Sequence, residues 1–446
     1  MKRRDFIKIS GAAALAAACA PRVAETGTQE EDNGRMQYRT NPLNGDKISL
    51  IGYGCMRWPM VPGPDGKDVI DQEAVNEMVD YAMKSGINYY DTSPAYLQGQ
   101  SEKAAAIALS KYPRESYFIA TKLSNFGDSS PEASKKMFEE SLRIFNTDHI
   151  DYYLLHAIGG GGRRAYEARY VENGIVDWLK QKKADGAIRN LGFSFHGAPE
   201  AFDHFMELHD RGEMKWDFVQ IEMNYVDWNH ADGVRNTNAS YLYEQLDKRG
   251  IPIVVMEPLL GGRLANVPAN IAAQLKAREP EKSVASWAFR FVGSYPRILS
   301  ILSGMSSMDP LRENVETFSH FKPLSEEEIE FMERMATEMK EYPLVNCTNC
   351  KYCMPCPYGI DIPGVFQHYN RCITEGTYAQ TREQKDYNKL KKAYLTSYDR
   401  TIDKVRQADH CIGCHKCEEH CPQSIKIPDE LLRIARYVEN LKQDLL

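Results

Sequence analysis

The chain has 446 residues, of which 43% are hydrophobic and 26% are charged, and its formal net charge is −7. This length predicts two or three domains with a large core, and the composition is that of an ordinary globular protein. The mild acidity argues against a dedicated nucleic-acid-binding protein, which would carry a strongly basic domain.

Residues 1–20 predict an export signal that is not part of the fold. Arg3 and Arg4 precede an apolar run, 9–18, that is too short to span a bilayer as a helix. This start resembles a twin-arginine signal, which exports folded proteins. We therefore expect a periplasmic or cell-envelope protein, with signal cleavage or, alternatively, lipidation at Cys19; an inert signal would leave it in the cytoplasm. The mature body is expected to have no transmembrane segment.

Residues 21–45 are polar and predict a linker. From residue 46 to residue 322, short apolar runs alternate with amphipathic segments. The apolar runs predict strands at 48–53, 87–91, 117–121, 150–156, 188–195, 218–222, 253–257 and 298–302. The amphipathic segments predict helices at 73–84, 102–110, 131–145, 175–183, 200–209, 241–248, 284–291 and 311–318. Eight such repeats predict an α/β fold, a closed (β/α)8 TIM barrel, and the lack of GxGxxG after the first strand disfavours an open doubly wound sheet.

Three polar side chains close apolar runs of this predicted barrel: Asp91, Lys122 and His156. In such barrels the active site lies at the C-terminal ends of the strands. Each residue alone has an ordinary explanation: a turn for Asp91, a solvated charge for Lys122 and a buried core position for His156. Their occurrence together at successive strand ends favours catalysis.

Several segments of this region resemble the aldo-keto reductases. The matching segments are 88–96, 101–102, 120–122, 151–156, Gln220 with Asn224, and 258–262. The resemblance covers residues 46–322, and it implies the family's catalytic tetrad at Asp91, Tyr96, Lys122 and His156.

Carbonyl reduction needs a hydride and a proton, and the tetrad suits the proton transfer. We expect Tyr96 to donate the proton, Lys122 to lower the tyrosine pKa from about 10, and Asp91 to hold Lys122 in place. His156 would orient the carbonyl oxygen and share in proton transfer. Trp58 and the glycine-rich loop 159–164 are expected to shape the substrate pocket, the alternative being an ordinary surface loop.

The resemblance also implies a nicotinamide cofactor, NADP or NAD. The residues that match the nicotinamide-binding positions are Ser194, Gln220, Pro258, Leu259 and Gly261. Those that match the loop and helix start around the adenosine phosphate are Gly304, Ser306 and Asn314. The chain departs from many NADP-dependent members at Gly304 and Pro310, where they have a lysine and an arginine, and at Met256, where an aromatic residue often stacks on the nicotinamide.

Residues 323–345 predict a helical connector, and residues 346–446 predict a second domain with two cysteine runs. The runs are Cys347-x2-Cys350-x2-Cys353-x2-Cys356-Pro357 and Cys411-x2-Cys414-x2-Cys417-x3-Cys421-Pro422. In paired runs of this type the last cysteine ligates the other cluster. We therefore predict two 4Fe-4S clusters, one held by Cys347, Cys350, Cys353 and Cys421 and the other by Cys411, Cys414, Cys417 and Cys356.

Two other uses of these cysteines are disfavoured, because zinc would want two pairs with a longer spacer and a disulfide framework suits a short secreted chain. In the first run, two residues instead of the usual three separate the third cysteine from the last. Cys372 is therefore the alternative to Cys356 as a cluster ligand. Helical patterns at 366–369 and 389–405 lie between the runs, and the domain resembles the α-helical ferredoxins of respiratory iron–sulfur subunits. A basic stretch at 385–406 is expected to be a solvated helix face, the alternative being a docking surface for an acidic redox partner.

The sequence therefore predicts an oxidoreductase that reduces or oxidises a small carbonyl or alcohol substrate, with electron transfer through two 4Fe-4S clusters. The alternative is an electron-transfer protein whose barrel is a non-catalytic binding scaffold. A cluster transfers single electrons whereas a hydride carries two, so direct coupling of the two halves requires a mediator.

Overall fold

The computed structural model describes residues 36–446 except residue 65 and residues 232–235. The predicted twin-arginine signal and residues 21–35 of the predicted linker lie outside the described residues. Within the described ranges, no helix combines the length and the apolar character that a membrane span requires.

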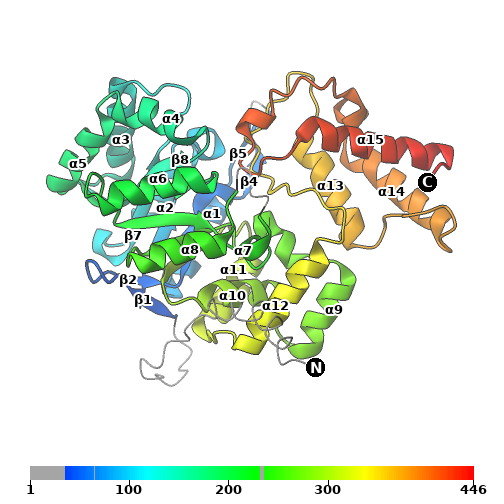
Figure 1. Cartoon of the computed structure of the whole chain (residues 1–446), viewed down its shortest axis with the longest axis horizontal. Helices are drawn as coiled ribbons and strands as arrows, with labels where there is room; N and C mark the ends of the chain where they lie inside the picture. Colours follow the sequence, from blue (N-terminus) through cyan, green and yellow to red (C-terminus); the bar gives the residue numbers. More distant parts are fainter. Residues whose placement is uncertain (1–35, 65, 232–235) are drawn as a thin grey trace, which may run out of the picture.

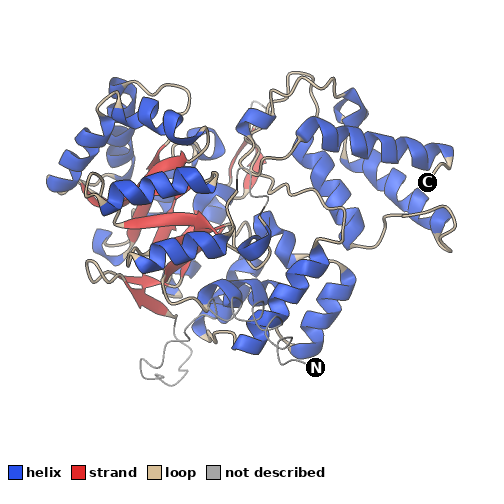
Figure 2. Cartoon of the chain, in the orientation of Figure 1, coloured by secondary structure: helices blue, strands red, loops and turns tan. Residues whose placement is uncertain are grey.

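Eight parallel strands of the described chain close into a barrel, which confirms the predicted fold class. Around the barrel they are β3 (Ile51–Gly54), β6 (Tyr89–Asp91), β7 (Phe118–Leu123), β8 (Ile150–Ile158), β9 (Ile188–Phe195), β10 (Phe218–Glu222), β11 (Ile253–Met256) and β12 (Ile298–Ser303). The first predicted strand is divided: its start is β2 (Lys47–Ser49), which pairs antiparallel with β1 (Tyr38–Thr40), and only its end joins the barrel as β3. Figure 2 shows the barrel strands enclosed by helices.

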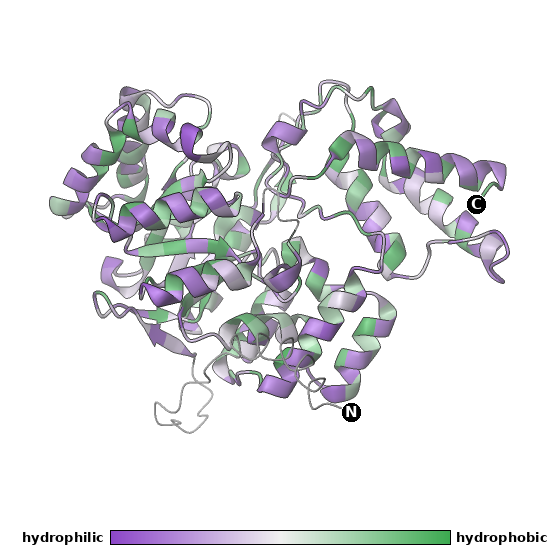
Figure 3. Cartoon of the chain, viewed as in Figure 1, coloured by the Kyte–Doolittle hydropathy of each residue, from purple (hydrophilic) through white to green (hydrophobic). Residues whose placement is uncertain are grey.

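Each predicted helix of the barrel is present, with ends shifted by a few residues. They are α1 (Gln72–Lys84), α2 (Ser101–Leu109), α3 (Pro131–Phe145), α5 (Ile175–Ala184), α6 (Pro199–Asp210), α8 (Ala239–Lys248), α10 (Val284–Gly293) and α11 (Met308–Ser319). Polar and apolar residues alternate along most of them, as Figure 3 shows, because one side of each helix packs on the barrel. Several elements were not predicted from the sequence pattern: α4 (Gly162–Tyr166), α7 (Asp227–His230), α9 (Ala269–Arg278) and the hairpin of β4 (Met60–Pro62) and β5 (Asp68–Ile70).

Local sequence explains why α3 begins and ends where it does. Ser130 precedes the helix, and its hydroxyl accepts a hydrogen bond from the backbone N–H of Ala133 at 3.3 Å. Pro131 occupies the first turn, where its missing N–H costs nothing. Asn146 ends the helix in the left-handed conformation that asparagine tolerates.

The barrel interior is filled by side chains from successive strands. They are Ile48, Tyr89, Ala120, Tyr152, Leu154, Phe218, Val254, Leu299 and Leu302. Residues two apart on a strand share a face, so the next inward position on β6, β7 and β8 is Asp91, Lys122 and His156 respectively. Strand geometry therefore directs these three polar side chains into the C-terminal mouth of the barrel.

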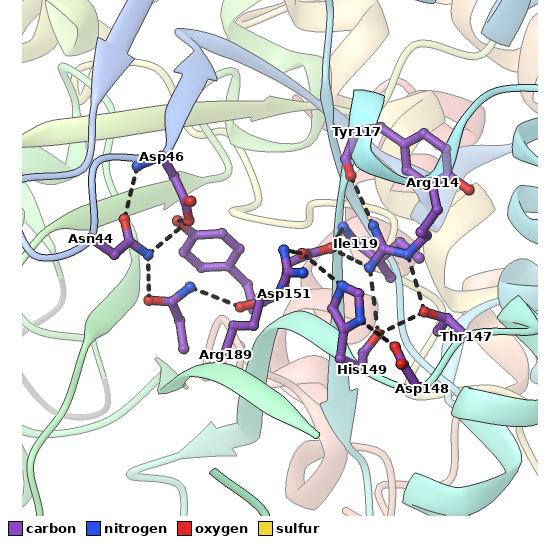
Figure 4. Close-up of polar contacts among 12 residues, drawn as sticks. Asn44, Asp46, Arg114, Tyr117, Ile119, Thr147, Asp148, His149, Asp151 and Arg189 are labelled. Atoms are coloured by element: carbon purple, nitrogen blue, oxygen red, sulfur yellow. Dashed lines mark hydrogen bonds and ion pairs between the residues drawn. The ribbon is translucent and has the colours of Figure 1, made fainter. Parts of the chain in front are cut away.

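A separate polar network lies at the opposite end of β8, around the buried carboxylate of Asp151 (Figure 4). This carboxylate accepts hydrogen bonds from the backbone N–H of Ile119 at 2.8 Å, from Arg189 at 3.1 Å and from Arg114. Burial alone would raise the pKa of Asp151, but the contacts with His149, Arg114 and Ile119 outweigh it and hold the pKa below its usual value. The active sites of such barrels lie at the other end, so we assign this network to the stability of the fold.

The chain leaves the barrel through α12 (Glu326–Met339), which lies within the predicted connector. Its start is fixed by a capping box, in which Ser325 and Glu328 each accept a hydrogen bond from the other's backbone N–H. The side of α12 formed by Phe331, Met332 and Met335 belongs to the main core of the barrel domain. The connector is therefore packed against the barrel.

The C-terminal part of the chain has its own apolar core, built on α13 (Ile362–Thr374), α14 (Tyr387–Thr401) and α15 (Ile427–Gln443). Figure 1 shows these helices, in orange and red, to one side of the barrel. The predicted helix at 366–369 is the middle of the longer α13, and the predicted helix at 389–405 corresponds to α14. Helix α15 was not predicted, and it packs against both α13 and α14.

Candidate active site and cluster-binding sites

A buried ion pair forms the base of the predicted tetrad. The Lys122 Nζ lies 2.5 Å from Asp91 Oδ1 and also donates to the backbone carbonyl of Thr92 at 2.8 Å. Lys122 and Asp91 are 1% and 2% exposed, respectively. Lys122 Nζ lies 4.8 Å from the centroid of the Tyr96 ring, so the ammonium faces this tyrosine. The structure thus brings Asp91, Lys122 and Tyr96 together, as predicted.

The pKa values in this group are governed by burial. Burial lowers the pKa of Lys122 and raises that of Asp91, and each shift is opposed by the charge of the partner. We expected Lys122 to lower the pKa of Tyr96; instead, burial raises it well above 10, and the carboxylates of Asp91 and Glu257 add to this. At neutral pH the Tyr96 phenol is therefore protonated and able to give up a proton.

His156 lies beside Tyr96 at the same mouth of the barrel. The two ring centroids are 5.7 Å apart, with the rings nearly perpendicular. His156 Nδ1 lies 2.6 Å from the hydroxyl oxygen of Ser124 and 3.3 Å from that of Ser93. Burial, followed by the charge of Lys122, lowers the pKa of His156 well below 6.5. The imidazole is therefore neutral and held through Nδ1, which leaves Nε2 for a substrate oxygen.

The tetrad opens into a cavity of about 1060 Å³. All but one of the residues predicted to bind the dinucleotide line it: Ser194, Gln220, Pro258, Leu259, Gly261, Gly304 and Ser306. The exception is Asn314, which is buried in α11 and donates a hydrogen bond to the Ser303 hydroxyl at 3.0 Å. Asn314 therefore supports the cavity wall from behind.

Two side chains fit the amide end of a nicotinamide. Gln220 is 2% exposed, lines the cavity, and its Oε1 has no hydrogen-bond partner among the described residues. A buried amide oxygen without a partner is costly, so a ligand N–H in the cavity would satisfy it. Ser194 is oriented by the backbone N–H of Ala157, which donates to its hydroxyl oxygen at 2.8 Å.

The region around Gly304 explains one departure from the NADP-dependent members of the resembled family. A Cβ atom at Gly304 would lie 2.9 Å from Cδ of Arg57, so the space in which a larger side chain would begin is filled by this arginine. Arg57 follows β3 and lines the cavity. A cation is thus present beside Gly304, but it is Arg57, which follows β3, and not a residue of the loop that follows β12.

The glycine-rich segment also lines the cavity, but Trp58 is not among the described residues that do so. Gly159, Gly160, Gly161 and Gly162 all contribute to the cavity wall. Trp58 is instead 2% exposed and packs on Tyr53 with ring centroids 4.8 Å apart. The expectation that Trp58 shapes the pocket was wrong, because its ring is packed in the main core instead.

Sequence reasoning missed Glu257, which follows β11 directly and lines the cavity. Its backbone has φ +54°, and its carboxylate accepts a hydrogen bond from the Gly261 N–H at 2.6 Å. Burial raises the pKa of Glu257, and the charge of Arg57 opposes this. A polar residue at a strand end was the only signal that could have identified it.

Sequence reasoning also missed Arg169, which lies in a π-helical turn, 167–171. Its guanidinium stacks on the ring of Phe126 at 4.9 Å and donates to Asn125 at 2.9 Å. Arg169 and Phe126 line the cavity together with the tetrad.

The cysteines of the second domain form two groups that match the predicted ligand sets. Cys347, Cys350, Cys353 and Cys421 line one small cavity between the cysteine loops and the start of α13. Burial and then the neighbouring thiolates of Cys350, Cys347 and Cys421 raise the pKa of Cys353. Crowded thiolates of this kind suit a cationic centre, which favours their charged form.

The second group is centred on Cys417. Burial, followed by the thiolates of Cys414, Cys411 and Cys356, raises the pKa of Cys417 to about 11. Cys356 is thus a neighbour of Cys417 in the second run, and its role as the fourth ligand of the second cluster stays a prediction. Cys372 is instead buried on α13, where its Sγ lies 3.5 Å from Nε2 of His368.

Zinc binds thiolates at about 2.3 Å, which brings the sulfur atoms nearly into contact. Among the described residues, no three His, Cys, Asp or Glu side chains are arranged to hold one metal ion. The described side chains therefore do not form a site for a single metal ion.

Comparisons with known proteins agree with this site. Residues 50–336 match the aldo/keto reductase family, and residues 346–427 match the 4Fe-4S dicluster domain. The chain is 27% identical over 308 residues to L-galactose dehydrogenase from Arabidopsis thaliana, covering 65% of this chain and 90% of that protein. It is 25% identical over 342 residues to the NADH-specific methylglyoxal reductase of Escherichia coli, covering 67% and 98%.

Solved structures show the same barrel. The aldo-keto reductase AKR11C1 from Bacillus halodurans covers 68% of this chain and 96% of its own, with a TM-score of 0.53 and 21% identity. An aldo-keto reductase from Klebsiella pneumoniae in complex with NADPH covers 68% and 95%, with a TM-score of 0.52 and 21% identity. The chain therefore belongs to the aldo/keto reductase family, and it is an oxidoreductase of that type with a C-terminal 4Fe-4S domain.

Proposed function

We propose that this enzyme interconverts a small carbonyl compound and its alcohol with NADP or NAD, and that electrons pass through two 4Fe-4S clusters in its second domain. One observation carries the proposal: Tyr96 and His156 lie side by side above the buried pair of Lys122 and Asp91, in a cavity shared with the expected dinucleotide-binding residues.

The residues of the chain account for the proton transfer. In the reducing direction the substrate carbonyl oxygen lies between the Tyr96 hydroxyl and His156 Nε2, and Tyr96 donates its proton to this oxygen as negative charge develops there. Lys122 then stabilises the phenolate, and Asp91 keeps the ammonium in position. A bound dinucleotide supplies or accepts the hydride.

Both dinucleotides are consistent with what is known of similar proteins. The Escherichia coli relative is named as NADH-specific, whereas the Klebsiella pneumoniae structure contains NADPH. In this chain Gly304 replaces a side chain that would favour the extra phosphate, but Arg57 brings a cation to the same place. The free amide oxygen of Gln220 supports nicotinamide binding in either case.

The names of two relatives indicate small, oxygen-rich substrates, a sugar for one and a dicarbonyl for the other. The cavity here carries several polar groups besides the tetrad, among them Arg57, Arg169 and Glu257. These groups support a polar carbonyl substrate over a purely aliphatic one.

Each cysteine group would hold one cluster: Cys347, Cys350, Cys353 and Cys421 the first, and Cys356, Cys411, Cys414 and Cys417 the second. Such clusters supply single-electron transfer when bound. The twin-arginine-like start supports export of the folded and loaded protein to the periplasm or cell envelope, where a redox partner protein would exchange electrons with it.

The test is anaerobic purification, followed by iron and sulfide analysis and assays with NADPH and NADH against a panel of aldehydes and ketones. Tyr96→Phe should lower kcat about 10²–10⁴-fold, because it removes the proton donor, while iron and sulfide contents stay unchanged. Tyr358→Phe, at an exposed tyrosine of the second domain, is the control. Wild-type protein that turns over no carbonyl compound with either dinucleotide would refute the proposal.

A further inference from the structure

The second domain forms part of the cavity above the tetrad. Two of its segments line the cavity: the first contributes Thr348, Cys350 and Tyr352, and the second contributes residues 419–424. We call residues 348–352 and 419–424 the cluster wall, because each segment contains a cysteine assigned to the first cluster. The barrel and the cluster wall thus enclose one space.

Gln423 attaches the second segment to the barrel. Its side-chain N–H donates to both carboxylate oxygens of Glu222, at 3.0 Å and 3.1 Å. Gln423 and Glu222 are both buried, and Glu222 is the last residue of β10. The segment is therefore fixed to the same strand that carries Gln220 two residues earlier.

The first segment is attached at its start. Arg57 donates a hydrogen bond to the backbone carbonyl of Thr348. The backbone of Thr348 also packs directly on Gly261. A Cβ atom added to Gly261 would lie only 2.4 Å from the Cα atom of Thr348. Gly261 also has φ +68°, a conformation that favours glycine. Both the close contact and the backbone conformation therefore require a glycine at this position. The contact places the segment over the predicted nicotinamide-binding loop.

Tyr352 is the aromatic residue of this first segment. It lines the same cavity as Tyr96 and Asp91. Tyr352 and Tyr96 therefore border one space, one from each domain. The backbone N–H of Tyr352 donates to the thiolate of Cys350, which ties the position of Tyr352 to the cluster loop.

We propose that the cluster wall determines substrate specificity: the part of the substrate beyond the reacting carbonyl contacts Tyr352, whose hydroxyl binds a hydroxyl group of the substrate. The preferred substrate is then a hydroxylated aldehyde or ketone. This inference rests on the proposed function, because the reacting carbonyl is placed at Tyr96 and His156. The iron–sulfur domain is thereby a part of the substrate site as well as an electron carrier.

Glyceraldehyde and propanal share a carbon chain and differ in hydroxyl groups, so their kcat/KM ratio measures the proposed contact. Tyr352→Phe should lower this ratio about five- to tenfold, because a single hydrogen bond is lost. Tyr352→Ala should raise KM for glyceraldehyde further, because the ring is lost as well. Tyr358→Ala, at a 46% exposed tyrosine of the same domain, should change neither value. Iron and sulfide contents show whether each variant has kept its clusters.

Hydrogen exchange provides a readout that does not need turnover. Glyceraldehyde, with or without NADP⁺, should slow exchange in segments 348–352 and 419–424 of the wild-type protein, and less so in Tyr352→Ala. An unchanged kcat/KM ratio in Tyr352→Phe, or no protection of either segment, would overturn the inference. If the wild-type protein reduced no carbonyl compound, the proposed function would fail, and exchange with glyceraldehyde alone would still decide whether the wall binds it.

Discussion

The side chain of Gln423 donates two hydrogen bonds to the carboxylate of Glu222, and this contact joins the iron–sulfur domain to the end of a barrel strand. Burial and the nearby carboxylates of Asp227 and Glu257 raise the pKa of Glu222 well above its ordinary value, while the bond from Gln423 opposes that shift. Gln423 lies two residues beyond Cys421, an assigned ligand of the first cluster. The contact therefore fixes the loop that carries Cys421 to the end of β10, beside the reductase cavity.

Gln423→Ala should destabilise the interface between the two domains. It leaves the Glu222 carboxylate buried without this donor, which costs about 1–3 kcal/mol in the free energy of unfolding. Thermal denaturation of the cluster-loaded protein measures the loss. Gln443→Ala is the matched control, because Gln443 makes an exposed hydrogen bond to Glu439 on α15. Equal melting temperatures for Gln423→Ala and Gln443→Ala would show that the interface does not depend on this contact.

Asp91→Asn should affect both stability and catalysis. It leaves the Lys122 ammonium buried without its counter-ion, and breaking a buried ion pair from one side costs about 3–5 kcal/mol. The misplaced ammonium would also stabilise the Tyr96 phenolate less well, so kcat should fall while the KM for the dinucleotide changes little. Asp177→Asn, which removes the exposed pair with Lys180, should leave both the melting temperature and kcat near wild type. A fully active Asp91→Asn variant would contradict the assigned role of the pair.

The pKa shifts of Tyr96 and His156 predict a flat pH profile for carbonyl reduction near neutrality. Tyr96 keeps its proton because its pKa is raised, and His156 stays neutral because its pKa is lowered. Between about pH 7 and pH 9 neither group changes its charge, so kcat/KM should be constant. The lowered pKa of His156 also means that its contribution to folding stability is present above pH 6.5 and is lost as the pH falls. An inflection in kcat/KM near pH 6.5 that disappears in His156→Gln would contradict this assignment.

Strand periodicity made much of the site predictable. Asp91, Lys122 and His156 each end an apolar run, and alternation along a strand sends all three into the same mouth of the barrel. Pairing by the Cys-Pro rule likewise placed Cys421 with the first run and Cys356 with the second. In both cases a short local pattern fixes which side chains meet.

The cluster wall had no such signal. Tyr352 lies between two cysteines, and only the docking of one domain on the other brings it near Tyr96. Trp58 was misplaced because nothing in its neighbourhood distinguishes a pocket residue from a core residue. By contrast, α15 could have been predicted, since its buried residues recur at helical spacing: Ile427, Leu431, Ile434, Val438 and Leu441.

Cys356 and Cys372 provide a direct test of the cluster assignment, because they are the two candidates for one ligand position. The charge of the Cys356 thiolate helps to raise the pKa of Cys417, whereas Cys372 lies on α13 beside His368. Cys356→Ser should therefore lower the iron and sulfide content of anaerobically purified protein by up to half, because one of two clusters loses a ligand. Cys372→Ser should retain the wild-type content, since its thiol is a small buried group in a helix core.

Spectroscopy of the reduced protein separates cluster loss from misfolding. Two interacting paramagnetic clusters should give a broadened signal in the wild-type protein and in Cys372→Ser, and a simpler signal from the first cluster alone in Cys356→Ser. Dinucleotide-dependent reduction of glyceraldehyde should persist in Cys356→Ser, because this residue and its group are not among the described residues that line the reductase cavity. Iron loss in Cys372→Ser with full loading of Cys356→Ser would reverse the assignment, and the second cluster would then have to draw its fourth ligand from α13.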